Sequence, residues 1–173
     1  MKKTRKLAIA AILSALGVVI LLLGSVISVL DLTAVAIASL LIMLAVIEVG
    51  GAYPYLIWLV TSILSILLLP DKFGALVYLV FGGIYPIFKA MFERLHYVVS
   101  WVLKFSCFNV MLILMILIGS YIMGLQDMGL VFTLPVFALC NVTFLLYDIA
   151  TTHLVTVYLI KLRKVLGLKN FFK

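Results

Sequence analysis

Long apolar segments without charged residues recur along this sequence, and they limit it to folds whose surface lies in lipid. The first runs from Leu7 to Leu30 and contains 24 residues without a charge. An α-helix of about 20 apolar residues crosses the hydrocarbon core of a bilayer. Apolar residues make up 67% of the chain and charged residues 11%, whereas a soluble domain is roughly half apolar and a quarter charged. The sequence therefore excludes an ordinary soluble domain.

Six apolar segments are predicted as transmembrane helices. Their expected bounds, to within a few residues, are 7–30, 32–51, 53–69, 73–92, 98–124 and 134–161. Glycine and proline separate or interrupt them, most clearly at Gly82, Gly83 and Pro86 in the fourth segment. No internal repeat or linker divides the sequence, so residues 1–173 are predicted to form one domain. The predicted fold class is all-α: an integral membrane protein with a compact bundle of six transmembrane helices.

Basic residues are concentrated on one side of this predicted bundle. Of 13 lysines and arginines, only Lys72 falls on the side opposite to the two termini, where Asp31, Asp71 and Asp127 lie instead. Loops that stay in the cytoplasm are enriched in lysine and arginine. We therefore expect both termini in the cytoplasm. The same distribution makes the lipid bilayer, and not nucleic acid, the expected partner of the net charge of +7.

The last segment, Leu134 to Lys161, contains a carboxylate near its middle, Asp148. A charge at that depth costs several kcal/mol unless it is paired or reaches water. At about 100° per residue, Asn141 and Asp148 share a helix face with aromatic side chains. Lipid offers no hydrogen-bond partners to such a polar face. We therefore predict that this face points into the protein and lines a solute site. The predicted solute-binding residues are Asn141, Asp148, Phe137, Phe144 and Tyr121.

Two interpretations of Asp148 stay open at this point. Lys104 lies about two turns into the fifth predicted span, and the fifth and sixth spans are expected to be antiparallel neighbours, so an ion pair between Lys104 and Asp148 is geometrically reasonable. The pair is either purely structural or part of a ligand or proton pathway. Lys89 and Glu93, four residues apart at the end of the fourth segment, are interpreted as a solvated pair.

The sequence contains none of the motifs that mark enzymes of the common classes. It has no G-x-S-x-G, no H-E-x-x-H, no P-loop and no Cys/His spacing typical of a metal site. We therefore predict a protein that is not an enzyme, without catalytic residues, metal or cofactor. Cys107 and Cys140 lie inside apolar segments and are interpreted as small packing residues.

Small residues follow one face of the first predicted helix, at Ala8, Ala11 and Ala15. Small side chains at this spacing let two helix backbones approach closely in a membrane. One interpretation is packing within the chain. The other is a docking surface for a second membrane protein.

The whole chain resembles the substrate-binding S component of an energy-coupling-factor (ECF) transporter. The resemblance rests on six compact spans, a basic start, the absence of a nucleotide site and, locally, the stretch from Lys6 to Leu16 around Ala11-x-x-x-Ala15. It implies a subunit of a bacterial plasma membrane that captures a vitamin or other micronutrient in a pocket towards the outside. It also implies partners on other chains: two ATPase subunits and a transmembrane coupling subunit, which the A-x-x-x-A motif would contact.

Two functions of other classes remain as alternatives. A stand-alone secondary transporter would use Asp148 as its proton or cation site, but the chain is small and shows no inverted repeat. A membrane scaffold that transports nothing would show the same apolar segments. Co-purification distinguishes them, because only a transporter subunit would bring ATPases with it.

Overall fold

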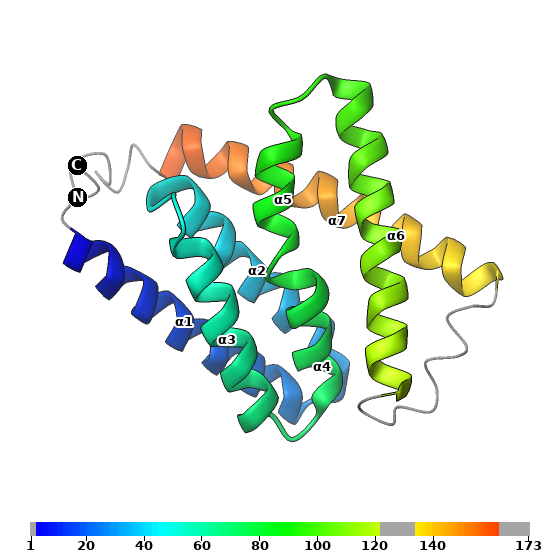
Figure 1. Cartoon of the computed structure of the whole chain (residues 1–173), viewed down its shortest axis with the longest axis horizontal. Coiled ribbons are helices and arrows are strands. Elements are labelled where there is room, and N and C mark those ends of the chain that lie inside the picture. The colour runs from blue at the N-terminus through cyan, green and yellow to red at the C-terminus, as the bar shows by residue number, and fades with distance from the viewer. Residues whose placement is uncertain (1–2, 122–133, 163–173) are drawn as a thin grey trace.

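The computed structural model describes residues 3–121 and 134–162, and within these ranges every regular element is helical. This confirms the all-α prediction. The main helices, shown in Figure 1, are α1 (Lys3–Val26), α2 (Asp31–Glu48), α3 (Tyr53–Leu68), α4 (Lys72–Val77), α5 (Tyr85–Phe92), α6 (Tyr97–Tyr121) and α7 (Leu134–Val157). Three short helical turns accompany them: η1 (Ser28–Leu30), the π-helical η2 (Tyr78–Gly82) and the π-helical η4 (Tyr158–Leu162).

Five helical segments are long and apolar enough to cross a membrane. They are Lys3–Val26, Asp31–Glu48, Lys72–Phe92, Tyr97–Ser120 and Leu134–Ile160. The remaining expected span, α3, is apolar but has only 16 residues, which is about 24 Å of helix at ~1.5 Å per residue. The described part of the chain is thus compatible with a multi-pass membrane protein.

The fourth segment is a helix broken in its middle, as its glycines and proline predicted. After the π-helical turn η2, the chain restarts as α5 with Pro86 in its first turn. A Cβ atom on Gly82 would lie 2.4 Å from Val35 Cγ1, and one on Gly83 would lie 2.2 Å from Trp58 Cδ1. Glycine at both positions therefore lets the break pack directly against α2 and α3.

The start of α1 and the end of the last helix lie at the same end of the molecule. Lys6 donates a hydrogen bond to the carbonyl oxygen of Val49 (2.7 Å), just after α2. At the other end of the described chain, the Tyr158 hydroxyl donates to Glu48 Oε1 at the end of α2 (3.1 Å). The start of α1 and the end of the described chain near Tyr158 therefore both lie beside the end of α2.

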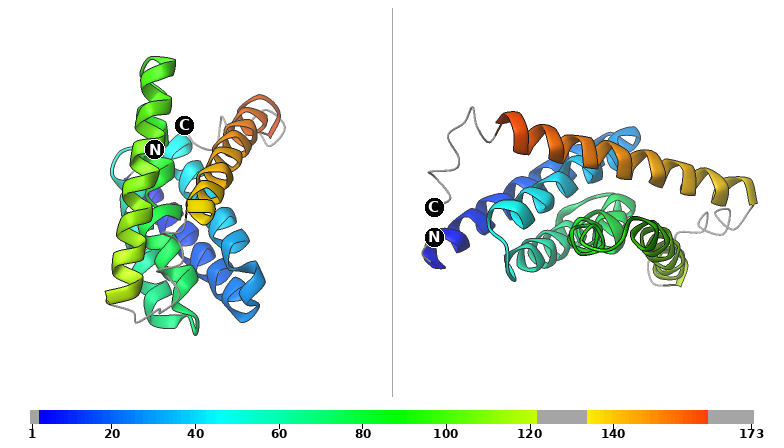
Figure 2. Two further views of the ribbon diagram at one scale, coloured as in Figure 1. Left: turned by 90° about the vertical axis from the view of Figure 1, so that its right-hand side faces the viewer. Right: turned by 90° about the horizontal axis from the view of Figure 1, so that it is seen from above.

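Helix α7 differs from its expected arrangement. It crosses α5 and α6 instead of running beside α6 along their length (Figures 1 and 2). Where they cross, the rings of Phe108 and Phe144 stack with centroids 4.3 Å apart. Of the α7 residues, only Phe144, Asp148 and Thr151 are buried. The crossing therefore concentrates the contacts of α7 into one short stretch, which includes the carboxylate singled out in the sequence.

Candidate functional site

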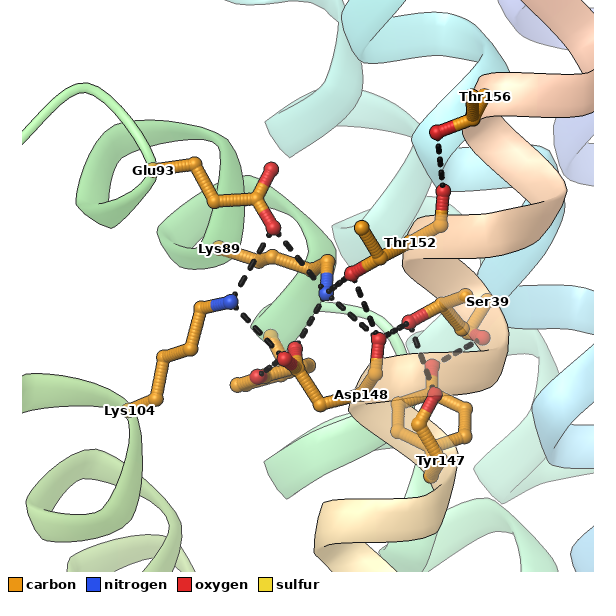
Figure 3. Close-up of polar contacts among 10 residues, drawn as sticks. Ser39, Lys89, Glu93, Lys104, Tyr147, Asp148, Thr152 and Thr156 are labelled. Atoms are coloured by element: carbon orange, nitrogen blue, oxygen red, sulfur yellow. Dashed lines mark hydrogen bonds and ion pairs between the residues drawn. The ribbon is translucent and has the colours of Figure 1, made fainter. Parts of the chain in front are cut away.

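Asp148 is almost completely buried, with 1% of its surface exposed, and it binds lysines from two other helices. Its Oδ1 atom forms an ion pair with Lys89 of α5. Its Oδ2 atom forms a second ion pair with Lys104 of α6, at 2.9 Å. Figure 3 shows both lysines pointing at this carboxylate from the helices that α7 crosses. The expected pairing of Lys104 with Asp148 is therefore present, and a second lysine joins it.

Glu93 completes the cluster from the loop after α5. Its Oε1 atom lies 3.2 Å from Lys89 Nζ and 3.1 Å from Lys104 Nζ. The interpretation of Lys89 and Glu93 as a solvated pair is wrong for Lys89, whose side chain is 2% exposed, whereas Glu93 is 41% exposed. Lys89 and Glu93 do form the ion pair that their four-residue spacing predicts. The Lys89 side chain is buried because it also pairs with Asp148.

Neutral groups satisfy the remaining hydrogen bonds around Asp148. The Tyr85 hydroxyl donates to Asp148 Oδ1 (2.6 Å). Lys89 Nζ also donates to the Asp148 carbonyl oxygen (2.9 Å) and to Thr152 Oγ1 (2.7 Å). Tyr85 and Lys89 are one helical turn apart on α5, and Asp148 and Thr152 one turn apart on α7, so each helix presents one polar face to the other. The two lysines and the two carboxylates therefore form a cluster with no net charge.

A cleft of about 490 Å³ opens beside this cluster, between α6 and α7 and under the α5–α6 loop. Lys104 and Asp148 form part of its wall, and Lys104 Nζ lies 5.3 Å from the centroid of the Trp101 ring. The other lining residues are Glu93, Leu95, Tyr97, Ser100, Ile149, Thr152 and His153. This volume is in the usual range for a small-molecule site. The cleft is therefore the candidate functional site of the described chain.

The other predicted solute-binding residues do not gather at this cleft. Phe144 is 2% exposed and belongs to an aromatic core with Phe108, Tyr85 and Phe105. Phe137 lies near the start of α7 and is 37% exposed. Tyr121 ends α6, and its side chain lies outside the described residues.

Asn141 is already bonded to another helix. Its amide and that of Asn109 on α6 donate to each other's oxygens at 3.3 and 3.2 Å. The second donor of Asn141 goes to the Phe137 carbonyl oxygen (3.0 Å). Interhelical amide pairs of this kind hold membrane helices together. Both asparagines were visible in the sequence, but their pairing depends on where α7 crosses α6.

The small residues of α1 divide between two faces. Ala8, Ala11 and Ala15 are exposed. The buried small residues are on the opposite face and pack towards α2 and α3: Ala10, Ser14, Gly17, Gly24 and Ser25. Within the described chain, nothing covers the Ala8–Ala11–Ala15 face.

No group of three or more His, Cys, Asp or Glu side chains is placed to hold a metal ion within residues 3–121 and 134–162. Cys107 and Cys140 are free and half-buried. Comparisons with family models, with curated proteins and with solved structures found no match to this chain.

Proposed function

We propose that this protein is the substrate-specific S component of an ECF-type importer, with six spans and both termini in the cytoplasm of a bacterial cell. The observation that carries the proposal is the exposed face of Ala8, Ala11 and Ala15 on α1. Packing within the chain uses the other face of this helix. A row of small side chains left open in this way supports close contact with a helix of a coupling subunit, which would bring two ATPase subunits.

The solute pocket of such a subunit belongs at the outer end. In the proposed orientation this is the end of α6 and the start of α7, where Tyr121 and Phe137 lie. The cleft beside Asp148 lies instead under the α5–α6 loop, on the proposed cytoplasmic side. We therefore do not assign the vitamin or micronutrient to that cleft.

The ionic cluster around Asp148 favours an importer subunit over a stand-alone secondary transporter. A carboxylate that couples transport to protons or cations must exchange its ion. Asp148 is instead held by two lysines and by the Tyr85 hydroxyl. This arrangement favours the structural interpretation of the pair.

Docking can be tested on α1 by enlarging its small face. We expect Ala11→Leu and Ala15→Leu to leave the isolated protein folded, because both side chains are exposed. The same changes should abolish co-purification with a coupling subunit and ATPases from membranes of the native host. Ala150→Leu, an equally exposed alanine on α7, is the matched control and should co-purify normally. If the wild-type protein co-purifies with no ATPase, the importer proposal is wrong, and the stand-alone transporter and the scaffold remain.

Orientation can be tested separately by cysteine labelling. Cys107 and Cys140 are first replaced by alanine, and single cysteines are placed at Arg94 and at Pro70, which are both exposed. In intact cells an impermeant maleimide should label the cysteine at position 70 only. If only the cysteine at position 94 is labelled, the true topology is the reverse of the proposed one.

A further inference from the structure

We propose that the cleft under the α5–α6 loop binds an organic monocarboxylate, whose carboxylate replaces that of Glu93 on Lys89 and Lys104. This goes beyond the proposed function, because the cleft lies at the end opposite to the predicted solute pocket. The two carboxylates of the cluster differ in how firmly they are held, and that difference carries the proposal.

Asp148 is the permanent counterion of the two lysines. Both of its oxygens bind ammonium groups, Tyr85 adds a hydrogen bond of 2.6 Å, and the residue is 1% exposed. Removing it from these partners would leave buried charges without compensation. Glu93 is held by Oε1 alone, is 41% exposed and lies in the loop just beyond the end of α5. Of the two carboxylates, Glu93 can therefore leave at much lower cost.

The charge that remains when Glu93 leaves defines the ligand. Two lysines against Asp148 have a net charge of +1, which one carboxylate neutralises and a phosphate dianion would exceed. The position vacated by Glu93 Oε1 lies within 3.2 Å of both ammonium groups. A ligand carboxylate placed there makes the same two charge-assisted hydrogen bonds that Glu93 now makes.

The rest of the cleft provides a hydroxyl and an apolar wall. Ser100 lines the cleft and is 7% exposed, and no residue of the described chain engages its hydroxyl group. This hydroxyl group can therefore donate a hydrogen bond to a ligand oxygen in the cleft. Trp101, Leu95 and Ile149 supply the apolar surface. The ligand class is therefore a carboxylate with an apolar or aromatic body, either a fatty acid from the membrane or a small soluble acid.

Fluorescence of Trp101 can report binding. The chain has two tryptophans, so Trp58→Phe leaves Trp101 as the single reporter. We would titrate this protein in lipid nanodiscs with decanoate, phenylacetate, decanol and decylamine. Decanol controls for partitioning into lipid. Saturable binding of an acid and not of decanol is the expected result, with decanoate pointing to a membrane source and phenylacetate to a soluble one.

Two variants test the exchange with Glu93. Glu93→Gln removes the competing carboxylate and should tighten acid binding by roughly tenfold or more, because charged hydrogen bonds then form without displacement. Lys104→Met should abolish acid binding. Since Glu93 is largely exposed, its variant is expected to fold, and the titration remains interpretable. Equal responses to decanoate and decanol would overturn the proposal. The proposal would also be overturned if Glu93→Gln bound the acid more weakly than wild type, or if decylamine bound to the wild type and not to this variant.

Discussion

Asp148→Asn should lower the free energy of unfolding by about 3–5 kcal/mol, the usual cost of removing one partner from a buried ion pair. The variant keeps the shape of the side chain but leaves Lys89 and Lys104 with only Glu93 as a counterion. Both lysines are nearly inaccessible, at 2% and 6% exposure, while Glu93 is 41% exposed. An excess positive charge would thus remain at the point where α7 crosses the other helices. Thermal unfolding in detergent micelles measures the loss.

Two further variants separate charge balance from other causes. Adding Lys104→Met to Asp148→Asn restores neutrality between Lys89 and Glu93, and we expect it to recover most of the lost stability. Glu93→Gln makes the same change in charge at an exposed position and should cost no more than about 1 kcal/mol. If Asp148→Asn is as stable as wild type while binding of the carboxylate in the cleft is lost, Asp148 serves ligand binding and not the stability of the fold.

The spans could be predicted because each depends on local sequence. Uncharged runs such as Leu7 to Leu30 fix where a helix can lie in lipid, and Gly82 and Gly83 with Pro86 mark the break between α4 and α5. The structure has these helices close to their expected bounds. The connection over residues 122–133 lies outside the described chain.

The site was only half predictable, because its partners come from different helices. The cost of a buried charge pointed to Asp148 and Lys104. Lys89 was misread because it lies 59 residues from Asp148 in sequence, and its four-residue spacing from Glu93 offered a simpler local partner. Asn141 was placed in the predicted solute site because periodicity gives a helix face but not the helix that it meets. Asn141 pairs with Asn109 because α7 crosses α6 at this point.

The inner face of α1 offers the second large effect, at Gly24. A Cβ atom on Gly24 would lie 2.3 Å from the Cβ atom of Ala34 on α2. Ala34 cannot move its Cβ by changing rotamer, so the two helices would have to separate. We expect Gly24→Ala to lower the unfolding free energy by about 2 kcal/mol, within the usual cost of overpacking a core. The measurement is thermal or denaturant unfolding in micelles.

Exchanging the two side chains tests this cause directly. Gly24→Ala with Ala34→Gly keeps one methyl group between the helices, and should return to within about 1 kcal/mol of wild type, the cost of glycine in a helix. Ala15→Leu adds more atoms to the same helix, but on its exposed face, and should change stability by less than about 0.5 kcal/mol. A neutral Gly24→Ala together with an unfolded Ala15→Leu would mean that α1 is turned the other way. The Ala8–Ala11–Ala15 face would then be internal, and no surface on α1 would remain for a coupling subunit.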